Sequence, residues 1–149
     1  MHTPNLSDAD LPERVALDHQ LSFALYGAAN RMVRLHKPIL DPLGLTFPQY
    51  LVLLELFAGT PKTVGDLGAK LGIDAGTITP LLKRLEAAGR ITRTRDASDE
   101  RRVLIELTKA GEALRHPIWA VTRQIDTVCG RTNEDNASLR NELDGFARA

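Results

Sequence analysis

Basic residues gather in one stretch of this chain, although its formal net charge is zero. Residues 83–102 carry seven lysine and arginine side chains against four carboxylates, whereas residues 1–18 carry one arginine against four carboxylates. A local excess of cationic side chains in a neutral chain is typical of a surface that neutralises phosphates. An ordinary solvated surface is the alternative interpretation of the same pattern.

Ten residues, most of them polar or basic, form the predicted DNA-contacting set. They are Thr77, Thr79, Pro80, Lys83, Arg84, Arg93, Arg95, Asp99, Arg101 and Arg102. Lysine and arginine bind phosphates and guanine edges, and threonine hydroxyls bind either. An arginine at a hairpin tip can enter the narrow minor groove. We expect Asp99 to pair with Arg101 and fix it, and Pro80 to bend its helix locally.

No pattern of catalytic or metal-ligating residues accompanies this set. The four histidines, at positions 2, 19, 36 and 116, lack metal-ligand spacing, and neither a Ser-His-Asp order nor a glycine-rich phosphate loop is present. Aromatic residues make up 5% of the chain, which offers few stacking platforms for single strands or RNA. The sequence therefore predicts no enzyme, no metal and no cofactor.

The cysteine and hydropathy patterns bear on the compartment. A single cysteine, Cys129, excludes an intrachain disulfide and suits a reducing cytoplasm. No apolar run approaches the ~18 residues of a membrane span, and residues 1–13 lack the basic and apolar regions of a signal peptide. We therefore expect a cytoplasmic protein without a membrane partner.

The elements that must present the basic residues follow one another as helix, turn, helix and hairpin. They are a helix from Thr63 to Leu71, a helix over 74–89, and strands over 91–95 and 103–107. The second helix has an apolar stripe at Ile78, Leu81, Leu82 and Leu85, so its polar side must face outward. Because the major groove accepts one α-helix, this order predicts a winged helix-turn-helix centred on residues 63–107.

Further helices are predicted around this unit, which makes the fold class mainly α. They cover residues 14–37, 46–57, 108–129 and 134–147. The predicted organisation is a flexible N-terminus (1–13), a helical dimerisation region (14–45 and 108–149) and a winged helix-turn-helix region (46–107). The apolar edges of the outer helices must be buried somewhere, and a twofold dimer interface is the economical solution. Such a dimer presents two recognition helices about one DNA turn apart.

Four segments resemble a known family. They are Leu17–Tyr26 (LDHQLSFALY), Leu45–Leu53 (LTFPQYLVL), Asp74–Leu85 (DAGTITPLLKRL), and the wing segment DERRV that starts at Asp99 and leads to Leu107-Thr108. These segments are similar to the organic-hydroperoxide-resistance (OhrR) branch of the multiple-antibiotic-resistance regulator (MarR) family. The resemblance covers about residues 14–115 and implies a helical dimer with winged-helix lobes. It implies a repressor that covers a pseudo-palindromic operator until a signal alters a sensor pocket.

The sensor positions implied by the resemblance depart from the branch. Where relatives carry a reactive cysteine in the first helix, this chain has Ser22, and the two tyrosine positions are His36 and Phe47. A serine hydroxyl cannot be oxidised to a sulfenic acid, so the usual peroxide switch is in doubt. A single change could be an engineered trap, but three changes together favour a natural departure.

Two sensing hypotheses follow. In the first, a small hydrophobic or aromatic effector binds where Ser22, Tyr26, His36 and Phe47 meet, or His36 confers a pH response. In the second, redox sensing persists through Cys129, which is either a remnant of the branch's resolving cysteine or a buried small apolar residue. A protein-interaction module that kept the fold without binding DNA is a third interpretation.

Overall fold

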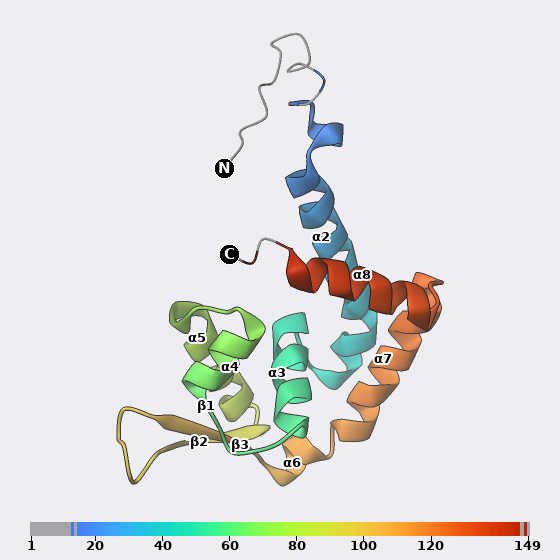
Figure 1. Cartoon of the computed structure of the whole chain (residues 1–149). Coiled ribbons are helices and arrows are strands. Elements are labelled where there is room, and N and C mark those ends of the chain that lie inside the picture. The colour runs from blue at the N-terminus through green and yellow to red at the C-terminus, as the bar shows by residue number, and fades with distance from the viewer. Residues whose placement is uncertain (1–12, 14, 147, 149) are drawn as a thin grey trace. The chain divides into compact units, whose positions relative to one another are not determined.

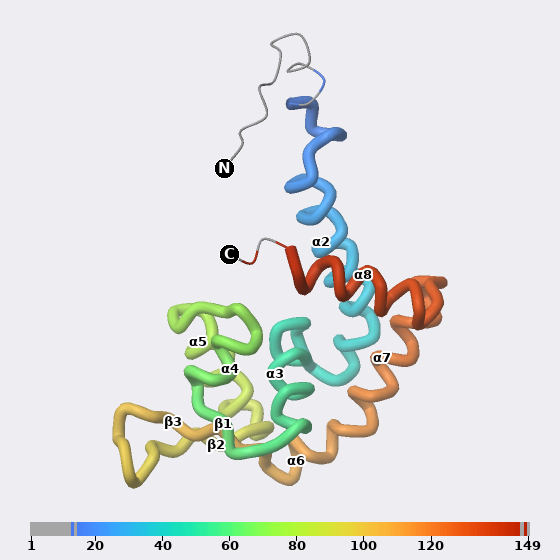
Figure 2. Tube along the Cα trace, viewed as in Figure 1, coloured from blue at the N-terminus to red at the C-terminus, as the bar shows by residue number. Residues whose placement is uncertain are grey.

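A computed structural model of the chain describes residue 13, residues 15–146 and residue 148. The chain divides into two units, Met1–Leu35 and His36–Ala149. The predicted flexible N-terminus, residues 1–13, lies outside the described residues apart from Glu13. Figure 1 labels the helices and strands, and the path of the chain can be followed in Figure 2.

The helix predicted over residues 14–37 is wrong at both ends. A short 3-10 helix, η1 (Leu17–His19), is followed by an extended Gln20, and α2 (Leu21–Leu40) begins only after it. At its other end α2 continues through Pro38, because a proline in the last turn removes only one of the helical hydrogen bonds. The 3-10 helix η2 (Asp41–Leu43) then ends the segment at Gly44, whose φ is +67°.

Helix α3 (Phe47–Phe57) begins with a capping box. The Thr46 hydroxyl accepts from the Gln49 N–H (3.4 Å), and the Gln49 side chain accepts from the Thr46 N–H (3.0 Å). Pro48 lies in the first turn, where its missing N–H is not needed. The helix is buried at Tyr50, Val52, Leu53 and Leu56, so it forms the centre of the second unit.

The winged helix follows α3 and confirms the mainly α fold with a small β-hairpin. Its elements are β1 (Lys62–Thr63), α4 (Val64–Leu71), α5 (Ala75–Ala87), β2 (Ile91–Arg95) and β3 (Val103–Leu107). The antiparallel sheet has the order β1-β3-β2, with Arg93 opposite Ile105 in the hairpin. The sequence did not predict β1, because a two-residue strand carries no periodicity. Its residue Lys62 pairs with Ile105 and ties the start of α4 to the hairpin.

The helix predicted over residues 108–129 is two helices, α6 (Lys109–Glu112) and α7 (Arg115–Cys129). Pro117 explains the break. In one continuous helix its ring would clash with the carbonyl group four residues earlier, but a proline is tolerated in the first turn of a new helix. Thr108 caps α6, since its hydroxyl accepts from the Gly111 N–H (3.0 Å). The last helix, α8, spans Asn133–Gly145 and begins at the cap residue Thr132.

The core of the second unit joins the winged helix to α7. Its fully buried aliphatic side chains come from α3, α4, α5, both hairpin strands and α7: Leu53, Leu56, Leu67, Ile78, Leu82, Leu85, Ile91, Ile105, Ile118 and Val121. In the described part of the chain, no single helix combines the length and the apolar content of a membrane span. The segments Leu21–Leu43 and Phe47–Phe57 have that length and apolar content only when they are taken together, and the chain bends between them.

Candidate nucleic-acid interface

The outward face of α5 carries five of the ten predicted contact residues. Thr77, Pro80, Lys83 and Arg84 are exposed, and Thr79 is half-buried. On the opposite side the predicted apolar stripe is buried: Ile78, Leu81, Leu82 and Leu85. The helix continues through Pro80. Helix α5 therefore has the one buried side and one polar side that a recognition helix requires.

The first turn of α5 is closed by its own cap. The Asp74 carboxylate accepts a hydrogen bond from the Thr77 N–H (2.9 Å). A free helix start binds phosphate through its N–H groups, but here a negative charge of the same chain occupies that position. Contacts from α5 must therefore come from side chains further along its exposed face.

The turn between α4 and α5 depends on two glycines. A Cβ at Gly68 would lie 2.9 Å from the Ile73 carbonyl oxygen, so only glycine permits this close approach. The same two residues share a hydrogen bond from the Ile73 N–H to the Gly68 oxygen (2.9 Å). Gly72 has a φ of +65°, which favours glycine at the end of α4. These contacts fix the position of α5 against α4.

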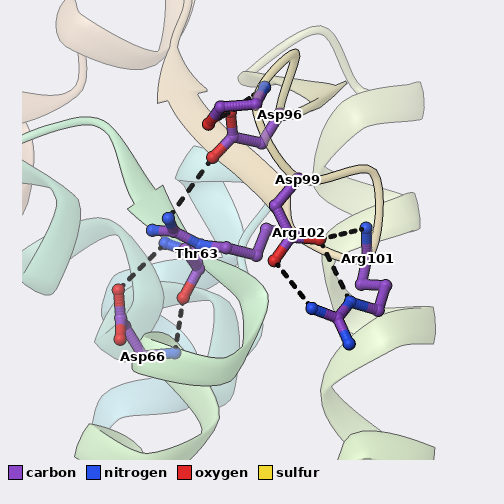
Figure 3. A network of polar contacts seen from close by, with 7 residues as sticks. Thr63, Asp66, Asp96, Asp99, Arg101 and Arg102 are labelled. Carbon is purple, nitrogen blue, oxygen red and sulfur yellow. Dashed lines mark hydrogen bonds and ion pairs between the residues drawn. The ribbon is translucent and has the colours of Figure 1, made fainter.

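Arg101 and Asp99 form the expected ion pair near the tip of the hairpin (Figure 3). The Arg101 Nε lies 3.1 Å from one carboxylate oxygen of Asp99, and its Nη2 lies 3.4 Å from the other. Hydrogen bonds from the Arg101 side chain, and then from its backbone, lower the pKa of Asp99. Yet the Arg101 side chain is 92% exposed. The pair therefore directs a cation outward without covering it.

The two arginines of β2 have different environments. Arg95 is exposed, and its Nη1 donates to the Glu100 carbonyl oxygen across the hairpin (2.8 Å). Arg93 is only 20% exposed, and its Nη1 lies 3.7 Å from a carboxylate oxygen of Glu86 on α5. Its backbone N–H also donates to Glu86 (3.1 Å). Arg93 thus joins the hairpin to α5 rather than projecting freely from it.

Arg102 lies at the base of the wing. Its Nη1 is 3.3 Å from a carboxylate oxygen of Asp96, and its backbone oxygen accepts from the Asp96 N–H (2.9 Å). In Figure 3 its side chain points back toward Thr63 and the start of α4, whereas Arg101 points the other way. Residue type alone does not distinguish these two neighbouring arginines, but their contacts do.

Two concavities flank α5. One, of about 540 Å³, is lined by the start of α4, by Thr79 and by the wing arginines Arg93, Arg101 and Arg102. The other, of about 650 Å³, lies between the start of α3 and the α5 residues Gly76, Thr77, Pro80, Leu81 and Arg84. The polar face of α5 is therefore a ridge between two hollows.

Two of the four predicted sensor residues are brought together by the structure. His36 is buried, and its ring centroid lies 4.8 Å from that of Phe47 in an edge-on arrangement. Tyr50, which sequence reasoning missed, joins them with its centroid 5.4 Å from that of His36. Its hydroxyl forms a hydrogen bond with the Thr122 hydroxyl of α7 (3.2 Å). The signal for Tyr50 was its place one helical turn after Phe47.

The other predicted sensor residues belong to different parts of the chain. Ser22 and Tyr26 are exposed residues of α2 in the first unit, so a pocket shared by all four sensor residues stays a prediction. Cys129 is half-buried at the end of α7. Within the described ranges, no group of three or more His, Cys, Asp or Glu residues could hold a metal ion.

Comparison with protein families and curated proteins identifies similar regulators. The family model described as transcriptional regulator SarA/Rot matches residues 34–118. The organic hydroperoxide resistance transcriptional regulator of Bacillus subtilis (strain 168) is 40% identical over 131 residues, which cover 88% of this chain and 89% of the relative. The match thus includes both the winged helix and the flanking helices.

Solved structures give the same result. AbfR has been solved from Staphylococcus epidermidis and also in a reduced form bound to DNA. This DNA-bound structure is 30% identical to the chain with a TM-score of 0.74, and the match covers 90% of this chain and 94% of the AbfR chain. CouR from Rhodococcus jostii RHA1, solved with p-coumaroyl-CoA, is 26% identical with a TM-score of 0.75 and covers 91% of this chain and 98% of its own. One of these neighbours was thus solved on DNA and the other with an aromatic ligand.

Proposed function

The chain belongs to the MarR family of transcriptional regulators, and on this premise we propose that it is an operator-binding repressor released by a small molecule. The observation that carries the proposal is the exposed face of α5 beside the outward-directed Arg101. Thr77, Lys83 and Arg84 provide hydroxyl and cationic groups suited to base edges and phosphates in the major groove. Arg101 and Arg95 reach toward the adjacent backbone or minor groove.

The operator is proposed to be a pseudo-palindrome read by a homodimer. Residues 46–107 contact DNA, and the helices of residues 14–45 and 108–149 join the two subunits. The outer helices α2 and α8 support this assignment, because each exposes large apolar side chains: Leu21, Phe23, Tyr26, Met32 and Val33, and Leu139 and Leu143. AbfR has been solved on DNA, and CouR, called a transcriptional repressor, on a 23-mer duplex. We place the protein's action in the cytoplasm.

The test starts from a random pool of DNA duplexes offered to the full chain. We expect a near-palindromic duplex to be enriched and its affinity to fall steeply between ~50 and ~200 mM salt, because phosphate contacts release counterions. Arg101→Ala should weaken binding and reduce the salt slope by about one contact. The matched control is Arg123→Ala, an exposed arginine of α7.

Failure of the wild-type chain to retain any duplex at ~50 mM salt would contradict the function and favour a protein-interaction module. Equal losses from Arg101→Ala and Arg123→Ala would contradict the assignment of the wing.

The proposed effector is a small hydrophobic or aromatic molecule that binds beside His36 and Phe47. The aromatic cluster supports this choice, as does the aromatic ligand of CouR. We propose that Ser22 leaves the chain without the reactive cysteine of the hydroperoxide-sensing branch. Titration of the DNA complex with aromatic carboxylates should release the duplex, and Phe47→Ala should raise the concentration required.

Redox release through Cys129 is the second candidate. It is favoured by the half-buried thiol and by AbfR, which has been solved in reduced, overoxidized and disulfide forms. Cumene hydroperoxide distinguishes the two: if it alone releases DNA, and Cys129→Ser abolishes this release, the redox candidate replaces the effector.

A further inference from the structure

The base of the wing is closed by two contacts between the same pair of residues. The Asp96 N–H donates to the Arg102 carbonyl oxygen (2.9 Å), directly beyond the last ladder pair of Arg95 with Val103. The side chains of Asp96 and Arg102 then meet at 3.3 Å. Backbone and side chains therefore hold together the two ends of the loop that carries Arg101.

The Asp96 carboxylate has a separate partner for each oxygen. Oδ1 accepts from the Ser98 N–H (2.9 Å) and from the Ser98 hydroxyl (2.7 Å), whereas Oδ2 faces Arg102. The two hydrogen bonds from Ser98 are the main causes that lower the pKa of Asp96, and the charge of Arg102 adds to them. The Asp96 side chain is only 15% exposed, because Ser98 and Arg102 cover both of its carboxylate oxygens.

A second carboxylate lies on the other side of Arg102. Asp66 closes the capping box of α4, where it accepts from the Thr63 N–H (3.3 Å) and donates its own N–H to the Thr63 hydroxyl (2.9 Å). Hydrogen bonds to the Asp66 carboxylate from the Thr63 side chain, and then from the Thr63 backbone, lower the pKa of Asp66, and the positive charge of Arg102 contributes to the same shift. Thr63 and Arg102 also line the same concavity. In Figure 3 the Arg102 side chain lies beside Thr63. Arg102 thus lies between the wing and the start of α4.

We propose that Arg102 is a positioning residue, which holds the two ends of the wing loop together through Asp96, beside the start of α4, so that Arg101 is presented to DNA. The inference rests on the proposed function and assigns different tasks to the two adjacent arginines. Arg102 pairs with Asp96, and its charge also helps to lower the pKa of Asp66 and Asp99, whereas Arg101 pairs with Asp99. The side chain of Arg102 is 53% exposed, and that of Arg101 is 92% exposed. Arg101 therefore supplies the cation that contacts DNA, and Arg102 holds the loop that carries Arg101.

Charge makes the two roles separable. If Arg102 binds phosphate, loss of the neighbouring Asp96 charge strengthens DNA binding, because a repulsive group is removed. If Arg102 positions the wing, the same loss weakens DNA binding. Asp96→Asn is suited to this test because its side-chain oxygen still accepts from Ser98 while the ion pair is lost. Glu100→Gln is the matched control, since it removes an exposed carboxylate from the same loop.

The experiment measures affinity for the duplex enriched from the random pool, as a function of salt. We expect Arg102→Ala and Asp96→Asn each to raise the Kd by about threefold to fivefold, near the upper limit for a partly exposed ion pair. The double variant should be no weaker than either single variant, because the two side chains act as one unit. The salt slope should stay unchanged in all three, whereas Arg101→Ala lowers it. Glu100→Gln should leave the Kd unchanged or lower it.

Amide hydrogen exchange of the DNA-free protein provides an independent measurement. Exchange of the Asp96 and Arg102 amides should accelerate by up to about fivefold in Arg102→Ala and Asp96→Asn, but not in Glu100→Gln. Unchanged exchange overturns the proposal, and so does an Asp96→Asn protein that binds DNA as tightly as the wild type. A salt slope reduced by about one in Arg102→Ala also overturns it. If the wild-type chain binds no duplex, the proposed function fails, while exchange still decides whether Arg102 holds the wing.

Discussion

Arginines of the hairpin share a residue type but differ in what surrounds them. Arg101 is held by one carboxylate and remains open to solvent, whereas Arg93 is mostly buried against Glu86. The Arg93 Nε is buried and has no hydrogen-bond partner among the residues that the structure describes. A partly satisfied buried guanidinium depends strongly on the partner it has. Glu86 is therefore expected to matter more for stability than a surface carboxylate does.

Glu86→Ala tests this dependence. The change removes the ion pair with Arg93 and the acceptor for the Arg93 N–H, and should lower the free energy of unfolding by roughly 1–2 kcal/mol. Alanine is the better helix former, so a loss of stability reports the missing contacts and not helix propensity. Urea unfolding at one fixed protein concentration provides the measurement. The exposed Glu100→Ala should change stability by less than about 0.5 kcal/mol, and a similar loss in both variants would contradict the role of Glu86.

At the scale of elements, the end of α5, the start of β2 and α6 meet through close contacts with backbone groups. The Arg90 carbonyl oxygen accepts from the Thr108 N–H (3.1 Å), and the Thr108 hydroxyl donates to the Gly89 oxygen (2.6 Å). Gly111 in α6 lies so close to Arg90 that an added Cβ would overlap its carbonyl oxygen. The end of α5, the start of β2 and α6 are therefore joined at a point that only glycine allows.

Gly111→Ala is expected to destabilise the protein by about 3 kcal/mol or more, because the obstacle is backbone and cannot rotate away. Gly145→Ala is the matched control. Gly145 also lies in a helix, and a Cβ there would meet nothing within 4 Å, so this change should be neutral or slightly stabilising. Thermal unfolding followed by circular dichroism compares the two variants. Equal melting temperatures would show that α6 can move away from Arg90 at little cost.

Local chemistry made most elements predictable. The capping boxes at Thr46 and Thr63 and the apolar stripe of α5 each depend on residues within a few positions, and all three are present. Strand β1 was missed because only its pairing with β3 defines it. The contact between Arg93 and Glu86 was missed for the same reason, since it depends on how β2 packs against the end of α5. Interactions between elements are what the sequence alone does not reveal.

At the scale of the whole molecule, both ends of the chain expose apolar side chains that a single chain leaves uncovered. Leu21 and Tyr26 of α2 are more than half exposed, and Leu139, Leu143 and Phe146 near the C-terminus are exposed by two fifths or more. Exposed apolar side chains that gather on the same element often mark a protein–protein interaction surface. In a twofold dimer the same surface of both subunits lies in the interface, so these side chains would be buried on each subunit.

Leu143→Asp tests whether α8 contributes to that interface. Leu143 is 46% exposed in the single chain, so the change should leave the fold of one subunit intact. In a symmetric dimer it places two carboxylates in an apolar contact, and we expect the dissociation constant of the dimer to rise by about tenfold or more. Sedimentation equilibrium measures this constant, and the exposed neighbour Glu142→Ala should leave it unchanged.

Operator affinity should then depend on protein concentration in Leu143→Asp alone, because two recognition helices must be joined to bind both half-sites. A wild-type protein that sediments as single chains, or a Leu143→Asp protein with an unchanged constant, would remove α8 from the interface.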